Sequence, residues 1–291
     1  MIVVKIMGGL GNQLFQYAMG LSLATRKNTP LKLDLRTINR QPLRKFQLPF
    51  FNIPFEVASE DEIAKIAIKN PQSVFEKGFV LFQGRLPYYM HRVVNEQSHR
   101  FDPRLFNSPK DCYLIGYFQC EKYFLNVRST ILEQFTLRDT TNSYVKDMCQ
   151  EMSGVDSVSL HIRRGDYATV AHTSERFGTL SLDYYDRAIK HIAGKVATPT
   201  FYVFSDDLDW AKQNLKIPYP VKFVEHTNAP DNVEIIMMSQ CKHHIIANSS
   251  FSWWGAWLGT FAQKNVVAPL VWYKDRSVHT SDICPADWVR L

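Results

Sequence analysis

The chain has 291 residues, of which 45% are hydrophobic and 13% aromatic. This length and composition allow one large core or two modest ones and exclude a disordered chain. The formal net charge of +6 comes from dispersed lysines and arginines without a nucleic-acid-binding motif, so we expect no nucleic acid partner.

The five cysteines are odd in number and scattered, without a CxxC pair, which favours reduced thiols over a disulfide frame or a zinc site. No run of the sequence reaches the roughly 18 apolar residues that a membrane span needs. The N-terminal residues also lack the charged start, apolar stretch and cleavage site of a signal peptide. We therefore expect a cytoplasmic protein.

The first half of the chain predicts three strands and two helices. A strand over residues 2–6 leads through a glycine-rich turn into a helix whose apolar residues recur at helical spacing. A second strand is predicted over residues 31–35. Residues 36–110 combine prolines and aromatics without a clean period, which predicts loops and short elements. A strand over 112–117 and a helix over 121–135 follow.

The second half alternates strands with helices, which is the pattern of a doubly wound parallel sheet. Strands are predicted over residues 157–162, 200–204, 221–224, 243–247 and 265–268, and helices near residues 182–193, 207–214, 231–240 and 251–262. With residues 137–156 as the linker, the chain divides into two α/β domains, 1–150 and 151–291, with a cleft between them. Sheets of this type bind ligands beyond the carboxyl ends of their strands, beside helix N-termini.

The first polar cluster, MGGLGNQ at 7–13, follows the first strand. Its glycines let backbone N–H groups approach a ligand closely, and Asn12 and Gln13 could bind a sugar or a phosphate. Leu14 stands where a dinucleotide fingerprint has its third glycine, and the Gly-Lys-Ser/Thr of a P-loop is absent. A tight turn followed by a helix N-cap is an equally good interpretation.

The second cluster, HIRRGDY at 161–167, comes at the end of a predicted strand. Arg163 and Arg164 are costly beside a buried strand unless an anion is bound, and their planar guanidinium groups suit phosphate oxygens. Successive side chains of an extended chain point to opposite sides. One arginine can therefore face a ligand while the other pairs with a carboxylate such as Asp166. The alternative is an internal network of ion pairs.

The third cluster lies at two strand ends, FSDD at 204–207 and NSSFSWW at 248–254. Asp206 could accept hydrogen bonds from the edge of a guanine, while the asparagine and serines could cap a helix that points at phosphate. Alternatively, Asp206 and Ser250 are plain helix N-caps. Trp253 and Trp257 lie four residues apart, which indicates packing along one helix face.

Six motifs, in order along most of the chain, resemble the α-1,2-fucosyltransferases, a family of inverting glycosyltransferases. They are GGLGNQLFQYA at 8–18, GYFQCEKYF at 116–124, HIRRGDY at 161–167, SLDYY at 181–185, FSDD at 204–207 and NSSFSWWGAWL at 248–258. Together they are far more specific than any single motif. Residues 36–110 are where we expect acceptor specificity to reside.

The resemblance implies a GT-B-like α/β fold, two Rossmann-like domains facing a cleft, with the acceptor on the side of 1–150 and GDP-fucose bound by 151–291. It implies transfer of L-fucose from GDP-β-L-fucose to the 2-hydroxyl of a galactose in an oligosaccharide, with inversion and without a metal or other cofactor. Arg163 would bind the β-phosphate. The residues implied in binding GDP-fucose are Gly11, Asn12, His161, Arg163, Arg164, Asp206, Asn248, Ser249, Ser250 and Phe251.

The resemblance does not carry over a general base. Related fucosyltransferases have a glutamate several residues beyond the arginines, where this chain reads ATVAH at 168–172. Arg163 and Asp166 are the predicted catalytic residues, with His172 and Glu175 as further candidates for the base. Animal members carry a membrane anchor that this sequence lacks, which favours a bacterial source. A lipid-linked acceptor would bring the protein to the inner membrane.

Two other functions remain open. Asp207 and Asp209 form a DxD sequence, which is typical of metal-dependent GT-A glycosyltransferases, although acidic residues are also expected where a helix begins. The chain could also be a non-catalytic protein that binds nucleotide sugars or glycans. Paired arginines beside a leaving diphosphate are hard to explain by binding alone.

Overall fold

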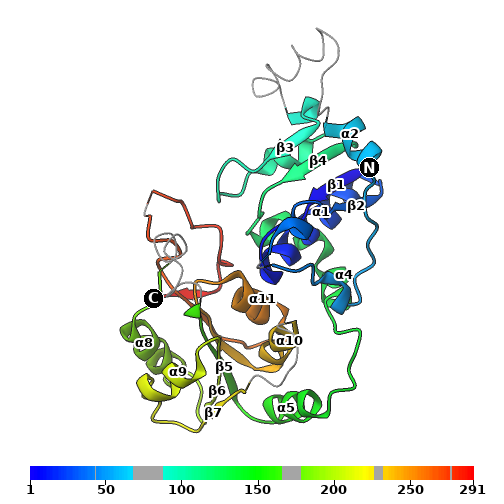
Figure 1. Cartoon of the computed structure of the whole chain (residues 1–291). Coiled ribbons are helices and arrows are strands. Elements are labelled where there is room, and N and C mark those ends of the chain that lie inside the picture. Colours follow the sequence, from blue (N-terminus) through cyan, green and yellow to red (C-terminus); the bar gives the residue numbers. More distant parts are fainter. Residues whose placement is uncertain (43, 68–87, 166–177, 226–231, 276) are drawn as a thin grey trace. The chain divides into compact units, whose positions relative to one another are not determined.

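The computed structural model describes residues 1–42, 44–67, 88–165, 178–225, 232–275 and 277–291. They form two compact units, Met1–Thr136 and Leu137–Leu291, and each unit is built on its own parallel sheet (Figure 1). The predicted class, two α/β domains, is confirmed. The predicted boundary after residue 150 runs through helix α5 (Ser143–Gly154), which belongs to the second unit because it packs against α10 (Asn232–Gln240) there.

The sheet of the first unit has the strand order β2-β1-β4-β3, and all of its strand pairs are parallel. Its strands are β1 (Ile2–Lys5), β2 (Leu31–Asp34), β3 (Val93–Asn95) and β4 (Cys112–Ile115). The sequence analysis predicted all of them except β3. β3 has three residues and lies within residues 36–110, where prolines and aromatics leave no clean period.

Helix α1 (Leu10–Lys27) and helix α2 (Glu60–Ala67) pack on opposite faces of this sheet. Gly20 of α1 lies so close to β1 that an added Cβ would be 2.5 Å from a methyl group of Val4. On the other face, two isoleucines of α2 pack against Val3. Because consecutive strand residues point to opposite faces, both valines are fully buried and β1 is apolar until its last residue.

Residues 36–110 contain several short helical elements in addition to α2, in agreement with the prediction for this stretch. In its described part these are η1 (Ile38–Arg40), η2 (Leu48–Phe50), η4 (Tyr88–Met90) and η5 (Pro103–Asn107).

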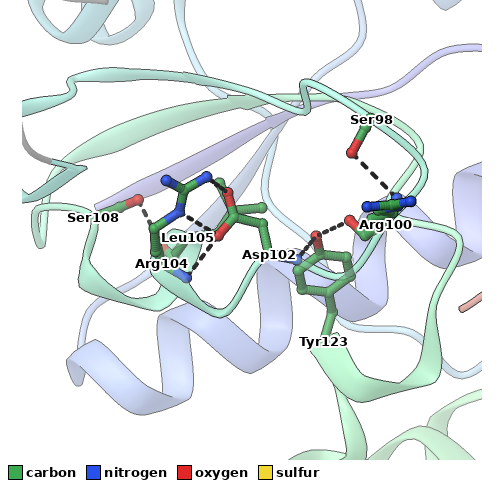
Figure 2. Close-up of polar contacts among 7 residues, drawn as sticks. All are labelled: Ser98, Arg100, Asp102, Arg104, Leu105, Ser108 and Tyr123. Atoms are coloured by element: carbon green, nitrogen blue, oxygen red, sulfur yellow. Dashed lines mark hydrogen bonds and ion pairs between the residues drawn. The ribbon is translucent and has the colours of Figure 1, made fainter. Parts of the chain in front are cut away.

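Polar contacts around Asp102 order the start of η5 (Figure 2). The Asp102 carboxylate accepts a hydrogen bond of 3.0 Å from the Arg104 backbone N–H and pairs with the Arg104 guanidinium at 2.8 Å. The Tyr123 hydroxyl accepts from the Asp102 N–H at 2.9 Å and donates to the Arg100 carbonyl at 3.3 Å. Residues that follow β4 therefore fix the segment that precedes it.

The end of the first unit and the start of the second unit differ from the prediction. Residues 121–135, predicted as one helix, form η6 (Glu121–Tyr123), η7 (Leu125–Val127) and α4 (Arg128–Gln134). Phe124 has a φ of −136°, which is outside the helical range, so the chain leaves the helical path between these short elements. The predicted linker 137–156 was also wrong for most of its length, because α5 occupies it with three buried residues at helical spacing.

The sheet of the second unit has the order β10-β9-β8-β5-β6-β7 and is parallel throughout. Its strands are β5 (Ser157–Ile162), β6 (Thr200–Ser205), β7 (Val221–Phe223), β8 (His243–Ile245), β9 (Val266–Ala268) and β10 (Val289–Arg290). Five of these strands were predicted, and the two-residue β10 was missed.

Helices cover both faces of this second sheet (Figure 1). On one face, α8 (Leu182–Ala193) and α9 (Leu208–Asn214) pack over apolar side chains of β5 and β6. The other face carries α5, α10 and α11 (Ser250–Leu258). The tryptophans of α11 are fully buried, which confirms their predicted role in packing. None of the helices in the described ranges combines the length and the apolar character that crossing a bilayer requires.

A fully buried glutamine joins the carboxyl ends of two strands in the first unit. The Gln16 side chain on α1 accepts from the Met7 N–H at 3.0 Å and donates to the Met7 carbonyl at 3.2 Å. The same amide donates to the Gly116 carbonyl at 3.2 Å. Met7 follows β1 and Gly116 follows β4, where the two strands are no longer paired. The Gln16 side chain supplies hydrogen bonds to the backbone groups of both loops there.

We predict that Gln16→Leu lowers the free energy of unfolding of the first unit by about 2–4 kcal/mol. Leucine fills a similar volume but leaves these buried backbone groups without a partner. The control is Gln97→Leu, because the Gln97 side chain is exposed; its effect should stay within about 0.5 kcal/mol. Urea unfolding followed by amide hydrogen exchange in α1 measures the difference, and equal stability of the two variants would contradict the prediction.

Candidate active site

Two charged dipeptides meet at the carboxyl edge of the second sheet. Strands β5 and β6 are neighbours, and their register pairs Ile162 with Ser205, the last residue of each strand. Arg163 and Arg164 follow β5, and Asp206 and Asp207 follow β6. The register therefore places the arginines of one predicted cluster beside the aspartates of another.

The Asp206 carboxylate binds both arginines. Its Oδ2 pairs with Nη1 of Arg163 at 3.0 Å, and its Oδ1 accepts a hydrogen bond of 2.8 Å from the backbone N–H of Arg164. The side chains of Arg163 and Asp206 are 26% and 23% exposed, so the pair is accessible to a ligand. A Cβ at Gly165 would lie 2.5 Å from Oδ2 of Asp206, which explains why this position has no side chain.

Arg164 points toward helix α9. Its Nε lies 3.2 Å from Oδ2 of Asp207, and its guanidinium stacks on the Trp210 ring at 4.0 Å from the ring centre. Such stacking over an indole is favourable for a cation. That one arginine faces a ligand stays a prediction. Both arginines pair with a carboxylate, which agrees with the alternative of an ion-pair network, and Asp207 is the carboxylate that pairs with Arg164. Asp166, named for that role and as a catalytic residue, lies outside the described residues.

The helix caps fall one residue away from the positions considered in the sequence. Asp207, and not Asp206, caps α9 by accepting from the Trp210 N–H at 3.2 Å. Ser249, and not Ser250, caps α11 by accepting from the Phe251 N–H at 3.3 Å. Asp206 is therefore not a helix cap, and its carboxylate serves the arginines.

The turn that precedes α11 is fixed by hydrogen bonds to two other segments of the second unit. Asn248 is buried, and its side-chain amide donates to the carbonyls of Gly178 at 3.3 Å and Trp272 at 3.2 Å. Ser249 is buried as the cap, whereas Ser250 and Phe251 are partly exposed at the start of the helix. The backbone N–H groups of this first turn can bind an anion.

His161 lies in β5, shortly before the two arginines, and is buried. Its ring centre is 5.7 Å from that of Phe251, and its carbonyl accepts a hydrogen bond from the Tyr185 hydroxyl. Burial, together with the nearby Arg163 charge, lowers the pKa of His161 to about 3. The imidazole is therefore neutral at pH 7, and its contact with Phe251 connects the strand that carries the arginines to the start of α11.

The two remaining predicted residues, Gly11 and Asn12, belong to the first unit. Gly8 adopts a φ of +80°, and the loop enters α1 without a side-chain cap. Gly11 is buried, and Oδ1 of Asn12 accepts a hydrogen bond of 2.8 Å from Gln119. Gln13, also considered as a ligand-binding residue, is fully buried and donates to the carbonyls of Gly8 and Lys45.

The sequence analysis missed Glu96, which follows β3. Its carboxylate accepts from the Tyr117 N–H at 2.7 Å and from the Phe118 N–H at 3.1 Å, in a turn where Phe118 has a φ of +52°. Burial raises the pKa of Glu96 despite these two hydrogen bonds. Glu96 thus holds the turn from which Gln119 reaches Asn12. The sequence would have pointed to Glu96 only if β3 had been predicted, because Glu96 directly follows that strand.

The acidic residues of the DxD sequence serve helix α9. The Asp207 carboxylate pairs with Arg164 and caps the helix by accepting from the Trp210 N–H. Asp209 lies in the first turn of the helix. Within the described ranges, the structure contains no group of three or more His, Cys, Asp or Glu residues arranged to hold a metal ion. The expected independence from metals remains a prediction.

Comparisons with known proteins identify one family, whose model matches the whole chain. The family model described as Glycosyl transferase family 11 matches residues 1–291. The α-1,2-colitosyltransferase of Escherichia coli is 33% identical over 100% of this chain and 98% of its own length. The O-antigen biosynthesis glycosyltransferase WbnK of Escherichia coli is 32% identical, with 98% of each chain covered. The galactoside 2-α-L-fucosyltransferase Sec1 of Mus musculus is 23% identical over 89% of this chain and 64% of its own.

Solved structures of fucosyltransferases share the fold. Fucosyltransferase NodZ from Bradyrhizobium has a TM-score of 0.52 at 15% identity, covering 87% of this chain and 91% of its own. NodZ α-1,6-fucosyltransferase soaked with GDP-fucose has a TM-score of 0.51 at 18% identity, covering 88% and 91%. The GT-B-like α/β fold that the resemblance implied is confirmed.

We predict that part of the acid sensitivity of the second unit comes from His161. The unfolded chain takes up a proton below pH 6.5, whereas the folded protein keeps this imidazole neutral down to about pH 3. Stability is therefore lost as the pH falls from 6.5, by about 1.4 kcal/mol per pH unit for this group. Between pH 7 and pH 5, His161→Gln should lose about 2 kcal/mol less stability than the unsubstituted protein.

Urea unfolding followed by tryptophan fluorescence measures this difference, because all six tryptophans lie in the second unit. Each protein is compared with its own value at pH 7, so a general loss of stability in the variant cancels. His279→Gln, at an exposed position, is the matched control. An unchanged pH dependence in His161→Gln would show that this histidine is protonated in the folded state.

Proposed function

Because this chain belongs to glycosyl transferase family 11, we propose that it transfers L-fucose from GDP-β-L-fucose to the 2-hydroxyl of a galactose in an oligosaccharide. That it is a glycosyltransferase related to the α-1,2-fucosyltransferases follows from the family and its relatives. The observation that carries the proposal is the partly exposed Arg163, fixed by Asp206 at the carboxyl edge of a parallel sheet. This is where such sheets bind nucleotides.

The reaction we propose is a single displacement. The oxygen of the galactose 2-hydroxyl forms a bond to the anomeric carbon of fucose, while the bond from that carbon to the diphosphate oxygen breaks and GDP leaves. The β-linked donor gives an α-linked product. Negative charge develops on the diphosphate, so fixed donors at that place lower the barrier most.

Arg163 is the donor that we assign to the β-phosphate. Its guanidinium offers a planar fork to phosphate oxygens, and Asp206 holds it at 3.0 Å without burying it. The first turn of α11 supplies backbone N–H groups, and Phe251 in that turn contacts His161 below the arginine. Arg163 and the helix turn are thus connected through one side-chain contact.

Asp206 has two proposed roles. It positions Arg163 through its ion pair, and one carboxylate can in principle accept both the N1–H and the amino group of guanine. Both of its oxygens already accept from the arginines, so positioning is the first role. We keep the guanine contact as the second role because each carboxylate oxygen has two lone pairs.

The proton of the galactose hydroxyl needs an acceptor. Asp166, His172 and Glu175 remain the candidates for this base, and all three lie outside the described residues. If the transition state has strong oxocarbenium character, the base contributes modestly and the charge on the diphosphate dominates.

A second candidate donor is GDP-colitose. The Escherichia coli relative that aligns with the whole chain is named an α-1,2-colitosyltransferase. Colitose is fucose without its 3-hydroxyl, so both sugars leave the same diphosphate and need the same charge stabilisation. The two donors would differ only in the contacts made to one hydroxyl group.

We also propose a bacterial source and an acceptor that is lipid-linked in the cell. The relative WbnK is named for O-antigen biosynthesis. The first unit holds more than half of the 34 lysines and arginines but well under half of the 28 aspartates and glutamates. Such a basic unit is attracted to anionic lipid headgroups, which would bring it to the inner membrane.

We predict that Arg163→Lys lowers kcat roughly 30- to 1000-fold, equivalent to about 2–4 kcal/mol of transition-state stabilisation, because lysine cannot form the bidentate contact. The matched control is Arg187→Lys, which changes an exposed arginine that also pairs with an aspartate, at 2.9 Å. Initial rates of GDP release measure both variants. A folded Arg163→Lys protein with the kcat of the control would remove Arg163 from the mechanism.

Product analysis tests the proposed function itself. We expect fucosylation of a galactose-terminated oligosaccharide at the 2-position, identified by NMR, to persist in excess EDTA, and GDP to bind more tightly than UDP. Activity lost in EDTA and restored by manganese would favour the metal-dependent alternative. A higher kcat/KM for GDP-colitose would favour the second donor. Binding of GDP-fucose without any transfer would favour the binding-protein alternative.

A further inference from the structure

The first unit contains a pocket of about 920 Å³ on the face of its sheet that carries α2. Lys5, Asp34 and Ile115, the last residues of β1, β2 and β4, all line it. It therefore lies at the carboxyl ends of parallel strands, where α/β sheets bind ligands. Its volume is within the range of roughly 300–1,000 Å³ that small-molecule sites have.

A rigid polar group forms one wall of this pocket. Asp34 is 2% exposed and accepts from Arg36 at 2.9 Å and 2.6 Å and from the Tyr113 hydroxyl at 2.6 Å. Burial alone would raise the pKa of Asp34, but the hydrogen bonds from Arg36 and Tyr113 outweigh it and hold the pKa at about 2. The three side chains thus keep a single charged arrangement at neutral pH.

Two cations that line the pocket are available to a ligand. Among the described residues, neither the Lys5 ammonium nor the Arg40 guanidinium has an ion pair or a hydrogen bond. Lys5 ends an otherwise apolar strand and shares its face with Val3, so its side chain lies over the α2 side of the sheet. Lys5 is partly buried, and its ammonium group carries three N–H donors that a ligand in the pocket can use.

The charges of the pocket are balanced. Lys5, Arg36 and Arg40 are matched by Asp34 and by two acidic residues at the start of α2, Glu60 and Asp61. A phosphate site would have an excess of cations. A sugar hydroxyl, by contrast, donates and accepts at once, so a site with both charged donors and charged acceptors suits a neutral carbohydrate.

We propose that this pocket binds a neutral sugar of the acceptor oligosaccharide, with Lys5 and Arg40 as its hydrogen-bond donors. The inference rests on the proposed function, because it takes the substrate of this enzyme to be a glycan. It gives the acceptor a defined site in the first unit, which the resemblance had implied only as the side on which the acceptor binds.

Lys5→Met and Arg40→Gln test the proposal. Each should raise the KM for the acceptor about tenfold, the cost of one lost hydrogen bond to a charged group. The KM for GDP-fucose and the rate of donor hydrolysis without acceptor should not change. The matched control is Lys65→Met, which removes a lysine from the exposed side of α2 and should leave all three quantities unchanged.

Direct binding separates this site from the reaction. Saturation-transfer NMR with the acceptor oligosaccharide and no donor should show a signal with the unsubstituted protein that weakens in Lys5→Met and not in Lys65→Met. Ala64→Trp, at an exposed position on the rim of the pocket, should block binding even if Lys5→Met fails to fold.

Unchanged acceptor KM and NMR signals in all the pocket variants would overturn the proposal while leaving the proposed function intact. Competition by inorganic phosphate would also overturn it, by identifying an anion site. If the unsubstituted protein transfers no fucose but the oligosaccharide signal still depends on Lys5, the proposed function fails and the sugar site stands.

Discussion

The parallel pairing of β5 with β6 is the constraint on which the candidate site depends. Its register brings the residues after Ile162 beside those after Ser205, so two arginines at the end of a buried strand meet two aspartates. Asp206 fixes Arg163 without covering it, and Gly165 leaves room for this carboxylate. A shift of the register by one residue would reverse the direction of every side chain and leave the arginines without their counter-charges.

In the first unit, neutral and acidic side chains hold the loops at the carboxyl edge of the sheet. Its loops at the carboxyl edge leave the ladder, and their buried backbone groups need partners. Gln13 and Gln16 supply them for the loops after β1, β2 and β4, and Glu96 does so for the turn at Tyr117. These side chains hold a loop geometry in which Asn12 and Gln119 contact each other, so residues of both motifs contribute to the structure of the first unit.

The sequence allowed much of this structure to be predicted. The second sheet was predicted nearly complete, because its strands alternate with segments of helical spacing, which is the pattern of a doubly wound parallel sheet. The errors have physical causes: β3 lies in a stretch without a clean period, β10 has only two residues, and the non-helical backbone at Phe124 interrupts a helix that local propensity favoured. The caps were misplaced by one residue because adjacent aspartates or serines at 206–207 and 249–250 are equivalent in sequence.

The sequence by itself determined the family, the α/β class, and the segments in which glycines, arginines and acidic residues gather, since these follow from residue type and local spacing. Only the tertiary structure decided which carboxylate each arginine meets, that Gln13 and Gln16 are buried, and that Lys5, Asp34 and Tyr113 share one pocket. Such partners lie tens of residues apart. Strand order, register and the packing of helices on the sheets bring them together, and these depend on long-range burial that local spacing does not encode.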